Sequence, residues 1–200
     1  MLSVGILVFD DVEILDFSGP YEVFSTAARV HGRTARNGAA ANLFQCFLVA
    51  PAMRPVRARG GIKVLPDCVL TPSADLDVLI VPGGDVSAIL NDGAVIRWIA
   101  AQHPGTVITA SVCTGAFLLA KAGLLDGLDV TTHWEDQDDL QASFPALTVK
   151  RNVAWVDCGK VVTSGGISAG IDMSLHLVER LAGPELAAAT AKQMEYRWLQ

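Results

Sequence analysis

The chain has 200 residues, of which 51% are hydrophobic and 18% are charged, and its formal net charge is −6. This length suits a single domain over residues 1–200, and the apolar composition excludes a disordered chain. The acidic balance and the lack of a basic stripe argue against nucleic-acid binding by this chain alone. The four cysteines are widely spaced and include no Cys-x-x-Cys pair, which is not typical of a disulfide framework.

The N-terminal residues indicate a first strand and not a targeting segment. They lack a basic region and reach Asp10 and Asp11 too early for a signal peptide. The apolar runs are far shorter than the roughly 18 residues that a membrane-spanning helix needs. We therefore expect a cytoplasmic protein without a membrane partner.

The first half of the chain alternates apolar runs with helical patterns. The predicted strands are Ser3–Phe9, Leu43–Ala50 and Val78–Val81. A loop is expected over Asp10–Gly19, followed by a helix with Pro20 in its first turn. Gly60-Gly61 separates two short apolar runs, which predicts a hairpin between Val56–Ala58 and Ile62–Leu65.

The second half continues the alternation. A helix is predicted over Ile89–Ala101, a strand over Thr106–Ala110, a helix over Cys113–Ala122, strands over Val153–Val156 and Val161–Thr163, and helices over Ala169–Leu181 and Pro184–Tyr196. Repeated strand–helix alternation predicts an α/β protein whose mostly parallel sheet lies between two helical layers.

The segment around Cys113 carries the most specific chemical signal. A buried strand ends, one residue intervenes and a helix begins, and Ser111-x-Cys113-x-Gly115 has the form of a nucleophile elbow. A thiol at the start of a helix meets free N–H groups, so we expect its pKa to be lowered. The alternative is a small buried cysteine with no chemical role. Cys46, Cys68 and Cys158 have no comparable context.

Two further segments follow predicted strands and could meet the elbow. Asp16, between Leu15 and Phe17, is a candidate desolvated acid or base, although a helix cap or turn former is an equally good interpretation. Gly83 and Gly84 follow the strand Val78–Val81, and the Gly84 N–H could pair with the Thr114 N–H as an oxyanion-hole-type donor pair. An ordinary turn is the alternative for the two glycines.

His133 is the best-placed imidazole, because it precedes a helical stretch, and it is a candidate for orienting a substrate. A structural histidine is the competing interpretation. The histidines lack metal-ligand spacing, so we predict no metal site. The segment Thr163–Gly170 opens a helix and could bind an anion there, but it matches no nucleotide-binding motif.

Together these motifs resemble the ThiJ/PfpI family of the class I glutamine-amidotransferase-like superfamily. The resemblance rests on Val4–Asp11, Leu15–Pro20, Val81–Gly84, Ser111–Ala116, Thr131–Trp134 and Thr163–Asp172. It implies a flavodoxin-like three-layer sandwich with a nucleophile elbow and, commonly, a homodimer. Within the family the chain most resembles isonitrile hydratases and the sensor halves of AraC-type regulators. Thr114 stands where the peptidase-like branch has His, and Asp16 where the deglycase branch has Glu.

The resemblance to isonitrile hydratases implies a small-molecule substrate and no cofactor. Cys113 would attack an isonitrile carbon to give a thioimidate, with Asp16 supplying a proton and positioning water, and with Thr114, Gly83, Gly84 and His133 holding the substrate or intermediate. An N-substituted formamide is the product, which makes the protein a lyase. The chain ends earlier than expected of an isonitrile hydratase.

Two other functions remain open from the sequence. A non-enzymatic small-molecule sensor without the regulators' DNA-binding half would share the same motifs. A glyoxalase- or deglycase-like enzyme acting on reactive carbonyls would use the same cysteine. Turnover of a substrate at Cys113 separates the enzymes from the sensor.

Overall fold

A seven-stranded sheet forms the centre of the protein in a computed structural model that describes residues 1–34, 42–71 and 75–198. Its strand order is β10-β11-β7-β6-β1-β2-β5. All neighbours run parallel except the edge pair β10 and β11. The predicted mostly parallel sheet is therefore confirmed.

The main sheet consists of β1 (Leu2–Leu7), β2 (Phe44–Ala50), β5 (Cys68–Val69), β6 (Val78–Val81), β7 (Ile108–Val112), β10 (Trp155–Cys158) and β11 (Val161–Ser164). Two small sheets pair β3 (Val56–Arg57) with β4 (Lys63–Val64) and β8 (Asp129–Val130) with β9 (Thr148–Val149). The helices are α1 (Ile14–Thr34), α2 (Gly93–Gln102), α3 (Gly115–Lys121), α4 (Gln137–Ser143), α5 (Ala169–Ala182) and α6 (Pro184–Gln193).

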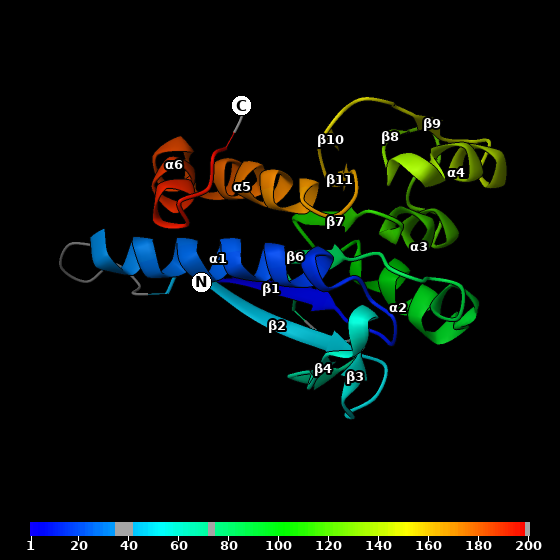
Figure 1. The fold of residues 1–200 in the computed structure, drawn as a ribbon, viewed down its shortest axis with the longest axis horizontal. Coiled ribbons are helices and arrows are strands. Elements are labelled where there is room, and N and C mark those ends of the chain that lie inside the picture. The colour runs from blue at the N-terminus through cyan, green and yellow to red at the C-terminus, as the bar shows by residue number, and fades with distance from the viewer. Residues whose placement is uncertain (35–41, 72–74, 199–200) are drawn as a thin grey trace.

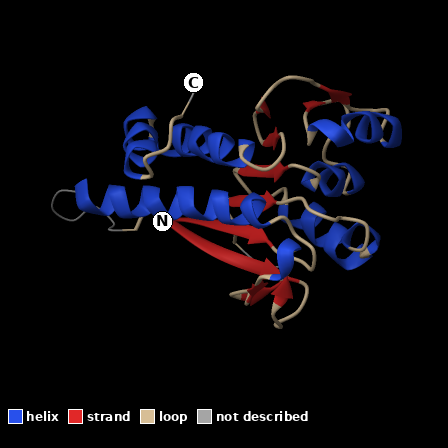
Figure 2. Ribbon diagram, viewed as in Figure 1, coloured by secondary structure: helices blue, strands red, loops and turns tan. Residues whose placement is uncertain are grey.

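The helices form two groups around the sheet (Figure 1). Helices α1, α5 and α6 pack against one another, and α2 packs against α3. This arrangement is the expected three-layer α/β sandwich, and Figure 2 shows the strands between helices. Strands β1, β6, β7 and β11 point the same way, so their carboxyl ends lie at one edge of the sheet, where open α/β sheets bind ligands.

The core explains why the strands read as continuous apolar runs. All four residues of β6 and all five of β7 are buried, as expected for strands covered on both faces. None of the helices among residues 1–34, 42–71 and 75–198 has the length and apolar character that crossing a membrane requires.

The predicted loop over Asp10–Gly19 is wrong in its second half. Helix α1 starts at Ile14, so Asp16 lies in its first turn and Pro20 lies inside it. The Ile14 N–H donates to Glu13 Oε1, and Ser18 Oγ donates to the Ile14 carbonyl. Pro20 lacks an N–H and weakens the turn that precedes it. The contacts of that turn with the rest of the protein hold it helical, and the proline signal alone could not reveal them.

The predicted helix over Ile89–Ala101 is also corrected at its start. A 3-10 turn occupies Ile89–Asn91, and α2 begins only at Gly93. The Asp92 carboxylate accepts hydrogen bonds from the Ala94 and Val95 N–H groups, which is the usual geometry of a helix N-cap. The remaining predicted elements occur with shifted ends, and α6 ends at Gln193 and not at Tyr196.

Candidate active site

Cys113 lies in the predicted strand-to-helix elbow. It directly follows β7 and has a positive φ of 57°, a conformation that non-glycine residues rarely adopt. Gly115 makes the turn feasible, because a Cβ at that position would collide with the Val81 carbonyl oxygen of the neighbouring strand. A strained cysteine held in this way is a common feature of reactive sites.

Hydrogen bonds from two other segments hold the elbow. The Cys113 N–H lies 3.2 Å from the Ser164 carbonyl oxygen and 3.2 Å from that of Gly165. The buried Thr132 hydroxyl donates to the Cys113 carbonyl at 2.7 Å. The cysteine backbone is therefore fixed on both sides. Nothing in the sequence distinguishes Thr132 as a positioning residue, although it adjoins the candidate His133.

Asp16 lies beside the cysteine in a fully buried position. Its side chain is 0% exposed, and its Oδ2 accepts the Gly83 N–H at 3.0 Å. Its Oδ1 has no hydrogen-bond partner of good geometry among the described residues, while the Cys113 thiol is close enough to lower the carboxyl pKa. Asp16 is neither a helix cap nor a turn former, so one of its two sequence interpretations is removed.

Burial raises the pKa of the Asp16 carboxyl to about 7, and its hydrogen bond from Gly83 opposes this only in part. Burial also raises the pKa of the Cys113 thiol to about 12, and the Asp16 charge adds to the rise. The expected lowering of the thiol pKa is therefore wrong. The Thr114 N–H at the start of α3 does favour the thiolate, but desolvation and the neighbouring carboxylate outweigh it.

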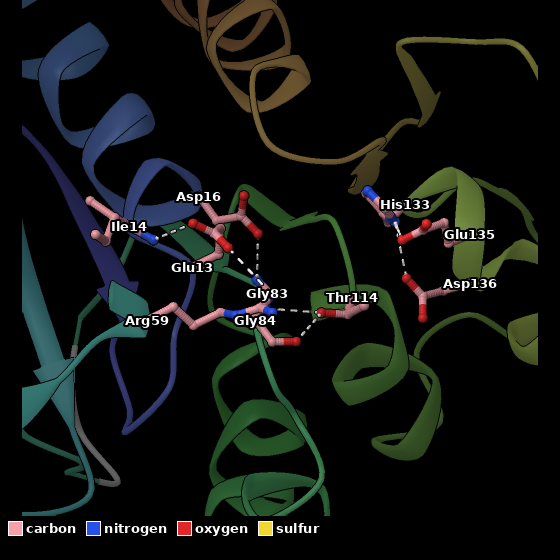
Figure 3. Close-up of polar contacts among 10 residues, drawn as sticks. All are labelled: Glu13, Ile14, Asp16, Arg59, Gly83, Gly84, Thr114, His133, Glu135 and Asp136. Carbon is pink, nitrogen blue, oxygen red and sulfur yellow. Dashed lines mark hydrogen bonds and ion pairs between the residues drawn. The ribbon is translucent and has the colours of Figure 1, made fainter. Parts of the chain in front are cut away.

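Thr114 connects the elbow to the glycine turn after β6. Its hydroxyl accepts the Gly84 N–H at 2.9 Å and donates to the Gly84 carbonyl at 2.9 Å (Figure 3). The Gly83 and Gly84 N–H groups, which the sequence suggests as donors to a substrate, therefore donate to Asp16 and Thr114 instead. A Cβ on Gly83 would approach the Thr114 nitrogen to 2.6 Å, so the turn and the elbow need this glycine for their close contact.

His133 lies on the opposite side of the site, in front of the 3-10 turn Trp134–Asp136. Its Nδ1 is 3.2 Å from Asp136 Oδ2 and 3.8 Å from Glu135 Oε2 (Figure 3). Gly166 packs against the ring, because a Cβ there would overlap His133 Cδ2. The imidazole is thus held in one orientation by a carboxylate and by a backbone contact.

A cavity of about 480 Å³ opens above the elbow, and Cys113, Thr114, Gly84 and His133 all line it. Cys113 is only 7% exposed, so a reagent must enter this cavity to reach the sulfur. The structure thus brings the six candidate site residues together, since Asp16 and Gly83, which are hydrogen-bonded to each other, lie next to these four. Phe117 and Ile167 supply apolar walls, and nothing in the sequence marks Phe117 as part of the site.

The segment Thr163–Gly170 reaches the cavity through Ile167, whose φ of 39° is unusual for a β-branched residue. Anion binding at the start of α5 stays a prediction. Within the described residues, no group of three or more His, Cys, Asp or Glu side chains is arranged to hold a metal ion.

Comparison with known proteins gives a consistent picture. The family model described as the DJ-1/PfpI family matches residues 2–180. The chain is 35% identical over 196 residues to the isonitrile hydratase of Pseudomonas putida, covering 98% of this chain and 78% of that protein. It is 30% identical over 194 residues to the HTH-type transcriptional regulator GbdR of Pseudomonas aeruginosa, covering 97% of this chain but only 50% of the regulator.

Solved structures share the fold. A ThiJ/PfpI family protein from Pseudomonas syringae has a TM-score of 0.84 and 27% identity, over 98% of this chain and 75% of that one. DJ-1beta of Drosophila melanogaster has a TM-score of 0.84 and 21% identity, over 98% and 99% of the two chains. An AraC family transcriptional regulator from Pseudomonas putida has a TM-score of 0.82 and 20% identity, over 97% and 100%.

Proposed function

This chain belongs to the DJ-1/PfpI family, and we propose that it is a cysteine-dependent hydratase that converts an isonitrile and water into an N-substituted formamide. The observation that carries the proposal is the buried carboxyl of Asp16 beside the thiol of Cys113, which itself lines a cavity. The identity of 35% to an isonitrile hydratase supports the choice of reaction. We further propose that the protein acts as a homodimer, as the family resemblance implies.

The protonation state of the pair suits this chemistry. With pKa values raised to about 7 for Asp16 and about 12 for Cys113, the pair holds one proton on sulfur and one negative charge on the carboxylate in mildly alkaline solution. An isonitrile carbon must receive both a nucleophile and a proton. Asp16 accepts the thiol proton as sulfur attacks and then transfers it to that carbon.

The proposed reaction balances in two steps. In the first, an S–C bond forms and the proton moves to the same carbon, which gives a thioimidate on Cys113. In the second, Asp16 takes a proton from a water molecule as the water oxygen adds to the thioimidate carbon, and it passes that proton to the imine nitrogen. The C–S bond then breaks, the hydroxyl proton moves to sulfur and the N-substituted formamide leaves. The Thr114 N–H, which favours the thiolate, stabilises the negative charge on sulfur as the C–S bond breaks.

A turnover assay with cyclohexyl isocyanide tests the proposal. We expect the wild-type protein to produce N-cyclohexylformamide over many turnovers. Cys113→Ala should reduce the rate by at least about a thousandfold, since the covalent route is lost. Cys158→Ala is the matched control, because Cys158 is exposed and does not line the cavity. Equal turnover by wild type and Cys113→Ala would refute the proposal.

A non-enzymatic sensor is the second candidate function. One observation favours it: the similarity to the regulator GbdR, of which this chain matches half. In that case a small molecule would occupy the cavity without being consumed. Saturable binding with no product for any isonitrile or reactive carbonyl would support the sensor over both enzymes.

A further inference from the structure

We propose that the cavity selects its substrate by charge, taking cationic isonitriles, those that carry an amine or a quaternary ammonium group, in preference to neutral ones and excluding anionic ones. The inference rests on the proposed function, since it specifies the substrate class of the same site. Five carboxylate side chains line the cavity that holds Cys113: Glu13, Asp85, Glu135, Asp136 and Asp139.

The cavity has little positive charge to balance these carboxylates. Arg59 is the one Lys or Arg among the described residues that line it. Its guanidinium nitrogen lies 3.5 Å from Glu13 Oε2, so these two charges largely offset each other. His133 faces Asp136 and Glu135, and the lining stays negative even when the imidazole is protonated.

The acidic residues come from separate parts of the chain. Glu13 precedes α1, Asp85 follows the glycine turn after β6, and Glu135 belongs to the segment in front of α4. Figure 3 shows Glu13 with Arg59 on one side of Thr114, and Glu135 with Asp136 on the other. A ligand in the cavity therefore has carboxylates on more than one side, which is unlike a single charged helix face exposed to solvent.

The negative charge extends to the reacting groups. The charge of Asp136 contributes to the raised pKa of the Cys113 thiol, and the charge of Glu13 contributes to that of Asp16. Charges that act on the sulfur also act on a substrate in contact with it. Low-dielectric walls concentrate such a field inside a cleft, which raises the local concentration of cations and lowers that of anions.

Charged thiol reagents test this selectivity without using the hydratase reaction. The two probes are 2-(trimethylammonio)ethyl and 2-sulfonatoethyl methanethiosulfonate. Each forms a disulfide with a thiolate and releases methanesulfinate. Peptide mass spectrometry gives the rate at Cys113, and exposed Cys158 in the same protein provides the reference. We expect the cation-to-anion rate ratio at Cys113 to exceed that at Cys158 by about tenfold at low salt and to fall as salt screens the field. Equal ratios would overturn the inference.

Adjacent residues of α4 offer a matched pair of variants. Asp139 lines the cavity, whereas Asp138 does not line it and pairs with Arg151. Asp139→Lys should reduce the rate ratio at Cys113 at least about threefold, because it changes the charge of the cavity lining. Asp138→Lys changes the net charge of the protein by the same amount outside the cavity, so it should leave the ratio nearly unchanged. If both variants reduce the ratio equally, net charge and not the cavity lining is responsible, and the inference fails.

Three small isonitriles link the inference to catalysis: anionic isocyanoacetate, its neutral methyl ester and 2-isocyanoethyl-trimethylammonium. We expect kcat/KM to rise in that order. Equal values for all three would refute charge selection and leave the proposed hydratase intact. Absence of turnover with all three, together with the expected reagent ratio at Cys113, would refute the hydratase and retain a cation-selecting cavity.

Discussion

At the scale of single residues, the site depends on a conflict between burial and charge. Asp16 is fully enclosed, yet its carboxylate must act as a base. Its raised pKa means that the folded state binds a proton more tightly than the unfolded chain does. The protein therefore loses stability in order to keep an ionised carboxylate beside the thiol.

Replacing Asp16 by Asn should reveal this cost. Between about pH 4 and 7 the wild-type carboxyl is protonated in the folded state but ionised in the unfolded state, so its contribution to stability falls as the pH rises. Asn does not titrate. The free energy of unfolding of Asp16→Asn should therefore rise relative to that of wild type across this range. At pH 8 it should exceed the wild-type value by on the order of 2–4 kcal/mol.

Chemical denaturation at several pH values measures this difference. Asp138→Asn is a suitable control, because that carboxylate is exposed and its difference from wild type should stay nearly constant. A constant difference for Asp16→Asn as well would show that the buried carboxyl has an ordinary pKa. A loss of stability that grew with pH would contradict the assigned direction.

The sequence predicted which residues meet in the site better than it predicted their chemistry. Cys113 and Asp16 were identified because each follows a predicted strand. The lowered thiol pKa expected from the helix start was wrong, since the opposing effects come from burial and from a carboxylate 97 positions away in the chain. Distances across the fold determine such shifts, and spacing along the chain does not reveal them.

At the scale of elements, the elbow requires two backbones to approach closely. Helix α3 starts against the end of β6, where Gly115 faces the Val81 carbonyl and Gly83 faces the Thr114 nitrogen. Both contacts leave no room for a Cβ. Packing between β6 and α3 thus requires both glycines. The sequence indicates such a requirement only where the motif, here the nucleophile elbow, is already known.

Gly115→Ala should displace the elbow. The added methyl group collides with backbone and not with a flexible side chain, so we expect a loss of about 1–3 kcal/mol in unfolding free energy, together with slower modification of Cys113 by thiol reagents. Gly105→Ala is the matched control, because its Cβ would meet the Gln102 carbonyl at an ordinary 3.6 Å. Equal effects of the two substitutions would show that the close contact does not matter.

Element boundaries were the part of the fold that the sequence predicted least well. Pro20 suggested a helix start, but α1 begins six residues earlier, because Glu13 and the packing of the first turn stabilise it. The short pair β8 and β9 was missed altogether. Two-residue strands have too little periodicity to be recognised, whereas the long buried strands were found from their apolar runs.

At the scale of the whole molecule, one sheet connects all parts of the site. Asp16, the glycine turn and Cys113 follow β1, β6 and β7, which are neighbours in the order of the sheet. The site therefore exists only when these strands are in register. The strand–helix alternation in the sequence predicted this architecture, and the comparisons with solved structures agree with it.

We predict that residues 1–200 unfold as one domain. Strands from the beginning, middle and end of the chain are hydrogen-bonded in a single sheet, so no part should unfold separately. Far-ultraviolet circular dichroism, tryptophan fluorescence and protection of Cys113 from thiol reagents should give the same denaturation midpoint. Separate midpoints would indicate more than one cooperative unit.

Covalent bonding of the Cys113 sulfur to an isonitrile carbon is the step on which the proposed function depends. Rapid-quench mass spectrometry of the wild-type protein mixed with cyclohexyl isocyanide detects this bond. We expect a transient adduct equal to the full mass of the isonitrile, located on Cys113 by peptide mapping and decaying as formamide appears. Formamide production without any adduct at Cys113, or with the adduct at another residue, would rule out the covalent mechanism.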